Sequence, residues 1–213
     1  MTKVDVSFRL SGETIPADHG YELFGALCRE YPHLHENVAV GVLPISGRLI
    51  GNRLLEITPK SRLVLRCLAE EIPPLIQLSG STLNLGGNSL RLGAAEVQSL
   101  LPRPKLFSRL VIIKGFTDPE PFLDAACRQT VEMGVKGKVT LVEHADVEIE
   151  NRGRLGGTHS PFLRRTICIR DKNIVGFALQ ISELTAEESI LIQENGLGGR
   201  RHFGCGVFIP DWR

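Results

Sequence analysis

Two short stretches of the sequence combine side chains that could move protons or bind an anion. The first is Pro-His-Leu-His-Glu over 32–36, where His33 and His35 stand two residues apart. The second is Gly-Leu-Gly-Gly-Arg-Arg-His-Phe-Gly-Cys-Gly over 196–206, close to the end of the sequence. Histidine suits proton transfer near neutral pH because its unperturbed pKa is about 6.5. The guanidinium groups of arginine match the geometry of phosphate oxygens.

The glycine-rich stretch does not have the spacing of a nucleotide-binding loop. It lacks a G-x-x-x-x-G-K-[ST] run, and Arg201 stands where the last glycine of G-x-G-x-x-G would fall. It is also expected to join a helix to a strand, whereas both nucleotide motifs lead into a helix N-terminus. Its glycines would let backbone N–H groups approach an anion closely and form an anion-binding nest. A long anionic backbone such as RNA fits this stretch better than a single nucleotide.

Further cations are concentrated in one region, although the net charge is only +1. Residues 151–165 include four arginines and no acidic residue, which is typical of the track of an anionic ligand. The alternative for each cluster taken alone is a set of solvated surface arginines. The arginines of this region are Arg152, Arg154, Arg164 and Arg165.

The pattern of the first half predicts a strand, a helix, several strands, a short helix and a hairpin. Residues 4–10 alternate apolar and polar side chains, and Asp18 is expected to cap a helix from Tyr21 to Tyr31. A Gly-Gly pair separates two alternating runs within 82–100, which is typical of a hairpin. Strands are also predicted at 37–45, 49–58 and 61–68, and a helix at 70–78.

The second half repeats this plan after a proline-rich stretch at 101–107. Thr185 and Glu188 form a capping-box pattern that predicts the start of a helix ending at Asn195-Gly196. Another helix is predicted at 118–134, and strands at 109–116, 138–149, 162–171, 173–182 and 203–210. We therefore predict an α+β chain with two domains, 1–104 and 105–213, each a sheet with two helices on one face.

Three stretches resemble one family, the CRISPR repeat-RNA (pre-crRNA) processing endoribonucleases of the RAMP superfamily. The stretch GLGGRRHFGCGVF is similar to the glycine-rich signature near the end of its members. DHGYELFGALCREYPHLHE resembles the first helix and the Leu-His-Glu that follows it, and KGFTDPEPFL resembles the opening of the second domain. The resemblance implies tandem ferredoxin-like (RRM-like) domains with a C-terminal glycine-rich loop.

The resemblance also implies an activity, the cleavage of CRISPR repeat RNA to mature crRNA without a metal or other cofactor. In that reaction a 2′-hydroxyl attacks the adjacent phosphate and leaves a 2′,3′-cyclic phosphate and a 5′-hydroxyl. The implied partners are the CRISPR repeat hairpin RNA or crRNA, and the option of other Cas proteins in an effector complex stays open. The alternative is a catalytically silent RAMP-type subunit that binds crRNA structurally, and a third reading is a scaffold unrelated to RNA.

The resemblance assigns the general base to His35, which matches the histidine of Leu-His-Glu. Some members carry a tyrosine on the first helix where this sequence has Cys28, so the general acid stays open between Tyr21, His33 and His19. His33 and His35 as a metal pair lack a third ligand nearby, and no metal is expected. The residues expected to bind RNA are Gly198, Gly199, Arg200, Arg201, His202, Arg152, Arg154, Arg164 and Arg165.

The remaining composition indicates an ordinary folded protein. Five widely scattered cysteines without C-x-x-C spacing argue against a disulfide framework and a cysteine zinc site. No apolar run approaches the roughly 18 residues that a membrane span needs, and residues 1–10 do not read as a signal peptide. We expect a cytoplasmic protein without a membrane partner.

Overall fold

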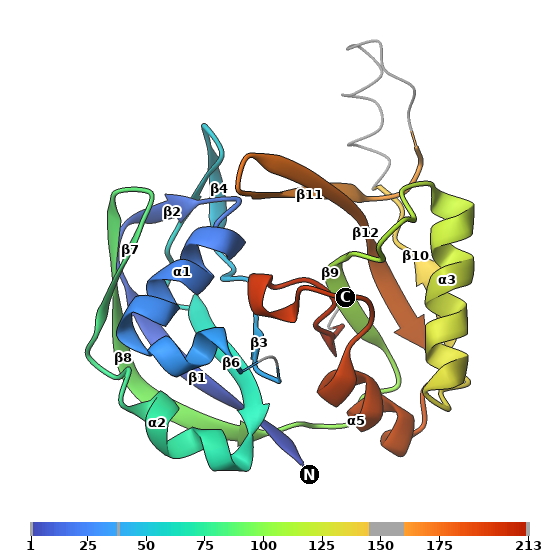
Figure 1. Ribbon diagram of the computed structural model, residues 1–213, viewed down its shortest axis with the longest axis horizontal. Helices are drawn as coiled ribbons and strands as arrows, with labels where there is room; N and C mark the ends of the chain where they lie inside the picture. Colours follow the sequence, from blue (N-terminus) through green and yellow to red (C-terminus); the bar gives the residue numbers. More distant parts are fainter. Residues whose placement is uncertain (1, 38, 145–159, 212–213) are drawn as a thin grey trace. The chain divides into compact units, whose positions relative to one another are not determined.

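The chain has an α+β fold made of two compact units (Figure 1). The computed structural model describes residues 2–37, 39–144 and 160–211. Two short segments from the second half belong to the first unit, so no single cut in the chain separates the units. The predicted boundary at 104/105 therefore stays a prediction. Unit 1 comprises Met1–Leu101, Ile167–Arg170 and Arg200–Gly204, and unit 2 comprises Pro102–Thr166, Asp171–Gly199 and Cys205–Arg213.

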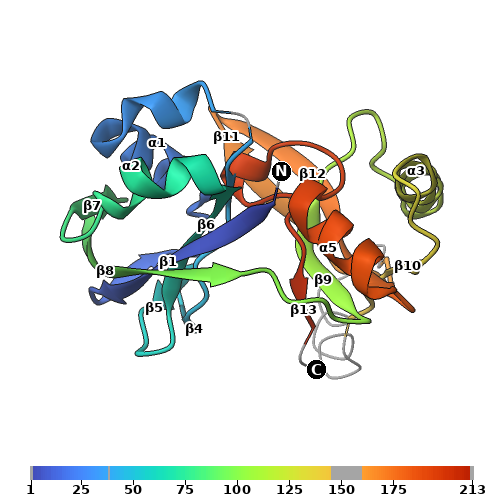
Figure 2. The same cartoon turned by 90° about the horizontal axis from the view of Figure 1, so that it is seen from below.

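Unit 1 is built on a five-stranded antiparallel sheet in the order β3-β6-β1-β8-β7. Helices α1 (Gly20–Glu30) and α2 (Ile72–Ile76) lie on one side of it (Figure 2). Without β7, the order and directions are those of a ferredoxin-like β-α-β-β-α-β unit. The strands are β1 (Lys3–Ser11), β3 (Gly41–Val42), β6 (Arg62–Leu68), β7 (Thr82–Leu85) and β8 (Asn88–Ser99).

The alternation seen in the sequence places the core of unit 1 between the sheet and its helices. Val6 and Phe8 of β1 are fully buried, as are Leu63 and Leu65 of β6. Helix α1 covers them with side chains spaced three and four residues apart, which is the period of one helix face. Its buried residues are Leu23, Phe24, Ala26 and Leu27.

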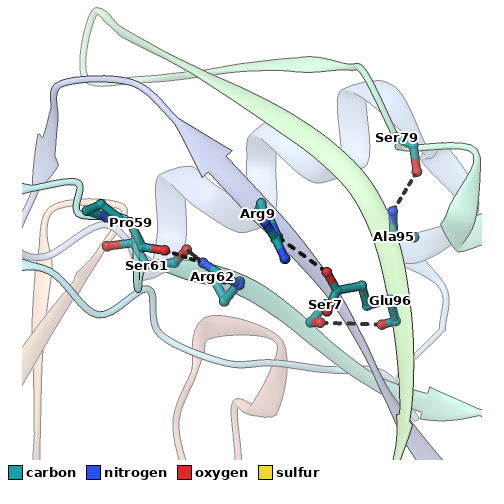
Figure 3. A network of polar contacts seen from close by, with 8 residues as sticks. All are labelled: Ser7, Arg9, Pro59, Ser61, Arg62, Ser79, Ala95 and Glu96. Carbon is teal, nitrogen blue, oxygen red and sulfur yellow. Dashed lines mark hydrogen bonds and ion pairs between the residues drawn. The ribbon is translucent and has the colours of Figure 1, made fainter.

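Polar contacts reinforce the pairing of β1 with β8 (Figure 3). Ser7 Oγ donates to the carbonyl oxygen of Glu96 at 3.3 Å, and Arg9 Nε lies 3.3 Å from Glu96 Oε1. Further along β8, the backbone N–H of Ala95 donates to Ser79 Oγ at 3.1 Å. Because Arg9 and Glu96 are exposed, their ion pair contributes no more than about 1 kcal/mol. These contacts help to set the register, while apolar burial supplies the stability.

Among its described residues, unit 1 also has a smaller sheet and three short 3₁₀ helices. The predicted strand at 49–58 is a hairpin, because Gly51, Asn52 and Arg53 turn the chain with positive φ. The predicted strand at 37–45 is reduced to β3. The small sheet has the order β2 (Thr14–Pro16), β5 (Leu54–Glu56), β4 (Arg48–Gly51), and the 3₁₀ helices are η1 (Pro32–His35), η2 (Ala69–Glu71) and η4 (Arg201–Phe203).

Unit 2 repeats the ferredoxin-like plan with the sheet order β10-β12-β9-β13, and β11 pairs with β12. The capping box predicted at Thr185 is confirmed, because the Thr185 side chain accepts from the Glu188 N–H and the Glu188 side chain accepts in return. The elements are β9 (Leu106–Val111), α3 (Pro119–Glu132), β10 (Lys138–Leu141), β11 (Arg164–Ile169), β12 (Lys172–Ser182), α5 (Ala186–Asn195) and β13 (Ile209–Pro210).

Two local predictions are wrong. Asp18 does not cap α1, because His19 is the N-cap residue and Asp18 Oδ2 accepts from the backbone N–H of Cys168 at 2.9 Å instead. The strand predicted at 203–210 contracts to β13, since Gly204 and Gly206 take positive φ and bend the chain.

Two features are absent from the described residues, a membrane-spanning helix and a cluster of metal ligands. No helix in that part of the chain is long and apolar enough to cross a membrane. Three or more His, Cys, Asp or Glu side chains do not gather there into a group that could hold a metal ion.

Candidate active site

One face of α1 forms the wall of a pocket of about 620 Å³. The side chains of Tyr21, Phe24, Cys28 and Arg29 reach this pocket, and Gly25 exposes its backbone there. Their spacing of three, four, seven and eight residues places all five on the same side of the helix. Every residue that lines the pocket belongs to unit 1.

The 3₁₀ helix η1 brings His35 to the same pocket. Pro32 begins this turn, and Leu34 anchors it because its side chain is buried in the core of unit 1. The neighbouring His33 and His35 are exposed. The His35 ring lies 6.2 Å from the Phe24 ring, measured between centroids. A buried leucine between two exposed histidines thus fixes the position of His35.

The segment Arg200–Gly204 lies against the start of α1. Phe203 meets the Phe24 ring edge-on at 5.4 Å between centroids. A Cβ atom on Gly20 would come within 2.5 Å of the Phe203 carbonyl oxygen, and one on Gly204 within 2.8 Å of Pro44 Cγ. Both glycines are therefore needed for the close approach. It places Arg200 and Phe203 in the wall of the pocket that His35 lines.

Two arginines of the pocket hold a backbone conformation that arginine rarely adopts. Arg200 has φ = 66°, and Arg170, in the turn between β11 and β12, has φ = 47°. Side chains with a Cβ atom disfavour this left-handed region, and such strain concentrates at functional sites. Arg29, Arg170 and Arg200 give the pocket three cations, against one carboxylate from Glu22. The electrostatic field of the pocket therefore favours an anion.

His202 lies next to this pocket, with its ring 4.8 Å from Phe24 and 4.3 Å from Phe203 between centroids. Burial lowers the pKa of His202 below its ordinary value, and the charges of Arg200, His35 and Arg201 lower it further. His35 and His202 both contact the Phe24 ring, which brings the two sequence stretches together within unit 1. His202 is thus kept neutral near pH 7.

Cys28 contributes a neutral group to the pocket wall. Burial raises the pKa of its thiol above the ordinary value, so the thiol stays protonated at neutral pH. A protonated thiol is a weak nucleophile. Cys28 therefore acts as an apolar part of the wall.

Comparison with known proteins identifies the family. The family model described as Cas6 Crispr matches residues 4–213. The CRISPR-associated endonuclease Cas6 of Myxococcus xanthus (strain DK1622) is 38% identical over 213 residues, which is 100% of this chain and 84% of that protein. The chain belongs to the Cas6 family.

Solved structures share the fold of this Cas6-family chain. The product of a Cas6-related gene from Pyrococcus furiosus has a TM-score of 0.63 at 15% identity, covering 97% of this chain and 98% of the other. A RAMP protein described as binding different RNA substrates has a TM-score of 0.62 at 12% identity and covers 98% of both chains. At these identities the likeness concerns the fold alone. It confirms the predicted tandem ferredoxin-like class.

The residues expected to do acid–base chemistry separate into two groups in this Cas6-family structure. Tyr21 and His35 line the pocket, whereas His33 does not and packs its ring against Tyr31 at 5.8 Å. His19 is buried, its Nδ1 lies 2.9 Å from the Pro16 carbonyl oxygen, and its Nε2 accepts from the Ile45 N–H at 3.0 Å. Of the three candidates for the general acid, Tyr21 is the one that lines the pocket together with His35.

The expectation that glycine amides form an anion nest is not favoured by the structure. The N–H of Gly198 donates to Gln129 Oε1 at 2.9 Å, and that of Gly199 donates to the Ile112 carbonyl oxygen at 3.0 Å. Both residues belong to unit 2. These two amides donate within unit 2, and phosphate contact by Gly198 and Gly199 stays a prediction.

The other expected RNA contacts lie elsewhere. Arg164 is exposed, Arg165 is partly buried, and both lie on β11 in unit 2. Arg152 and Arg154 lie outside the described residues. Contacts of these four arginines with RNA stay a prediction.

Sequence reasoning missed most of the pocket lining, and three of the missed residues, Arg29, Arg170 and Phe203, show why. Arg29 follows Gly25 by one helical turn, so the helix period could have placed it beside Tyr21 and Cys28. Arg170 carried a weaker signal, an Arg-Asp pair between two strands where Asn or Gly is the usual choice for positive φ. Phe203 could not be found, because its contacts with Phe24 and Tyr21 join residues that lie far apart in sequence.

Proposed function

We propose that this protein is an endoribonuclease that cleaves CRISPR repeat RNA and releases mature crRNA. One observation carries the proposal: an exposed histidine and three arginines line a single pocket in a chain of the Cas6 family. The 38% identical relative from Myxococcus xanthus is a CRISPR-associated endonuclease, which supports the same reading. We further propose that the reaction needs no metal and takes place in the cytoplasm.

In the proposed reaction His35 removes the proton of a ribose 2′-hydroxyl. The 2′-oxygen attacks the adjacent phosphorus, the bond from phosphorus to the 5′-oxygen breaks, and a 2′,3′-cyclic phosphate forms. The departing 5′-oxygen takes a proton from the Tyr21 hydroxyl and becomes a 5′-hydroxyl, and solvent then reprotonates Tyr21 and accepts the proton that His35 had taken. His35 and Tyr21 are suited to these roles because they line the same pocket.

The three arginines would bind and stabilise the phosphate. Negative charge accumulates on the oxygens of phosphorus as the 2′-oxygen attacks, and fixed cations lower the energy of that state. Of the three pocket arginines, Arg200 is the one next to His202 and Phe203 in sequence. His202 and Phe203 contact the helix that carries Tyr21. We therefore assign Arg200 to the cleaved phosphate and Arg29 and Arg170 to the neighbouring RNA backbone.

The deciding experiment is cleavage of a repeat transcript in the presence of EDTA. Wild-type protein should give products with a 2′,3′-cyclic phosphate, and His35→Ala should abolish cleavage while RNA affinity survives. His33→Ala is the matched control, since His33 is exposed on the same 3₁₀ helix but does not line the pocket. Cleavage that depends on added magnesium would contradict the proposal.

The same assay separates the alternative, a catalytically silent subunit that holds crRNA. Some family members carry a tyrosine on the first helix where this chain has Cys28. The absence of that tyrosine favours the silent subunit. Tight binding of the repeat by wild-type protein without any cyclic-phosphate product would support it. Association with other Cas proteins stays open under either outcome.

A further inference from the structure

We propose that the pocket beside α1 also holds one nucleobase, that of a nucleotide next to the cleaved bond, turned out of the RNA stack. The inference rests on the proposed function and adds a second part of the substrate to the same site. Three features of the pocket lead to it: its size and wall, the glycine in its lining, and its polar groups.

The pocket is larger and more apolar than a phosphate needs. Its volume of about 620 Å³ lies in the range of pockets that enclose small organic ligands. Phe24, Cys28 and Phe203 are among the residues of the wall, and the thiol is neutral. A phosphate needs only cations and N–H donors at a surface, whereas a base buries a flat apolar face against aromatic rings. The wall therefore suits a base.

Gly25 is unexplained by the packing of the protein itself. Glycine inside a helix is less stable than alanine. A Cβ atom added to Gly25 would meet only Arg29 Nη1, at 3.9 Å, so the space beside it is open. This contrasts with Gly20, where a Cβ atom would collide with the Phe203 backbone. A helix that keeps a destabilising glycine facing an open pocket indicates that a ligand approaches its backbone there.

Polar groups stand at the edge of the pocket where the rim of a base would reach. Arg29 Nη2 donates to the Asn84 carbonyl oxygen at 3.3 Å, which ties α1 to the hairpin of β7 and β8. Asn84 Oδ1 lies 3.0 Å from the Ser89 hydroxyl that donates to it, and this fixes the amide. Glu22 adds an exposed carboxylate. Acceptors and donors together match the mixed edge of a base, whereas a phosphate would need donors alone.

The chemistry of the reaction gives this subsite a purpose. The attacking 2′-oxygen and the leaving 5′-oxygen must stand in line across the phosphorus. A stacked RNA helix does not hold them so, and the nucleotide must rotate before it can react. A pocket beside His35 that receives the displaced base would hold the rotated nucleotide, which is how positioning accelerates a reaction.

The test combines a protein variant with an altered RNA. Single-turnover cleavage and affinity are measured for wild type, Gly25→Ala and Glu30→Ala, the last being an exposed α1 position away from the pocket. Each protein receives the intact repeat and two RNAs with a single abasic nucleotide on either side of the cleaved bond. Thermal unfolding of each protein is recorded in parallel.

We expect Gly25→Ala to unfold at the same or a higher temperature than wild type and yet to cleave intact RNA about 5- to 100-fold more slowly, the range that loss of one stacked base produces. One of the two abasic RNAs should slow wild-type protein to a similar extent. Gly25→Ala should then add little further loss with that RNA, because the two changes remove the same contact. Glu30→Ala should behave as wild type throughout.

Equal rates for Gly25→Ala and wild type on intact RNA would overturn the subsite, and so would full-rate cleavage of both abasic RNAs. Independent, multiplicative losses from the glycine and abasic changes would also overturn it. If wild-type protein binds the repeat without cleaving it, the proposed function fails on its own. In that case the affinity for the abasic RNAs tests the subsite: weaker binding of one of them supports it, and unchanged binding of both overturns it.

Discussion

At the residue scale, several positions around the pocket carry side chains that the local backbone alone would not select. Arg170 and Arg200 have positive φ, and Gly25 lies within a helix. Natural sequences are consistent with their local structure almost everywhere, and exceptions concentrate where function requires them. The same reasoning applies to Arg201, whose Nε is buried without a hydrogen-bond partner among the described residues.

Arg201 yields a prediction about stability and binding. A buried donor left without a partner costs about 1–3 kcal/mol, and burial lowers the pKa of the Arg201 guanidinium. Arg201→Met should therefore unfold at the same or a higher urea concentration than wild type, while its affinity for repeat RNA falls. Chemical unfolding and a binding titration measure the two effects. Unchanged affinity would remove Arg201 from the RNA contacts, and clear destabilisation would show that the guanidinium is satisfied in the free protein.

His202 yields a prediction about pH. Its pKa is lowered by burial first and then by Arg200, His35 and Arg201, so folding favours the neutral imidazole. The stability that follows is fully present above the unfolded pKa of about 6.5 and is lost as the pH falls through that value toward the lower folded pKa. Wild type should therefore lose more unfolding free energy between pH 7 and pH 5 than His202→Gln. Parallel curves for the two proteins would show that His202 titrates as it does in the unfolded chain.

Two variants at Arg200 distinguish the effect of its charge on cleavage from the effect of its backbone strain on stability. Arg200→Gly relieves the positive φ and Arg200→Ala keeps the strain, while both remove the guanidinium. Both variants should cleave about 100- to 1000-fold more slowly than wild type, because removing one charge-stabilising donor typically costs about 2.7–4 kcal/mol of transition-state energy. Arg200→Gly should unfold at a higher temperature than Arg200→Ala. Near-normal cleavage by either variant would argue that Arg200 does not touch the reacting phosphate.

At the element scale, the periodicity of the sequence was sufficient for the plan of both units but not for the site. Strands β1 and β6 and helix α1 follow from alternating or three-to-four spacing, which local residues impose. The strand predicted at 203–210 did not follow, because Gly204 packs against Pro44, which lies far away in sequence, and Gly206 folds back against Leu197 within the same loop. His35 was predicted from motif context, and Tyr21 was one of three candidates for the general acid. Their common pocket depends on tertiary packing, which a single sequence does not display.

The 3₁₀ helix η1 gives a prediction at this scale. Leu34 is 1% exposed, and its truncation to alanine should cost about 2–5 kcal/mol of unfolding free energy. Because Leu34 anchors His35, Leu34→Ala should lower kcat for repeat cleavage more than it weakens RNA binding at a temperature where the protein stays folded. Leu75→Ala is the matched control, since Leu75 is fully buried in the same core on α2. Equal losses of kcat in both variants would mean that η1 has no special role.

At the scale of the whole molecule, a net charge of +1 conceals a local concentration of cations. The pocket residues of unit 1 include three arginines and one glutamate. RNA binding should therefore depend on local phosphate contacts, with little help from overall attraction. Affinity governed by such contacts falls as salt rises, because each neutralised phosphate releases condensed counterions.

The salt dependence of binding tests this charge distribution directly. Each phosphate contact on single-stranded RNA contributes a slope of about −0.7 to the plot of log affinity against log salt. Replacing Arg29, Arg170 and Arg200 together by glutamine should make the slope shallower by about 2 if each arginine contacts one phosphate. Replacing Arg9, Arg48 and Arg62 instead removes the same charge from residues outside the pocket lining. The control should leave the slope nearly unchanged, and similar slopes for both triple variants would show that net charge rather than the pocket governs RNA binding.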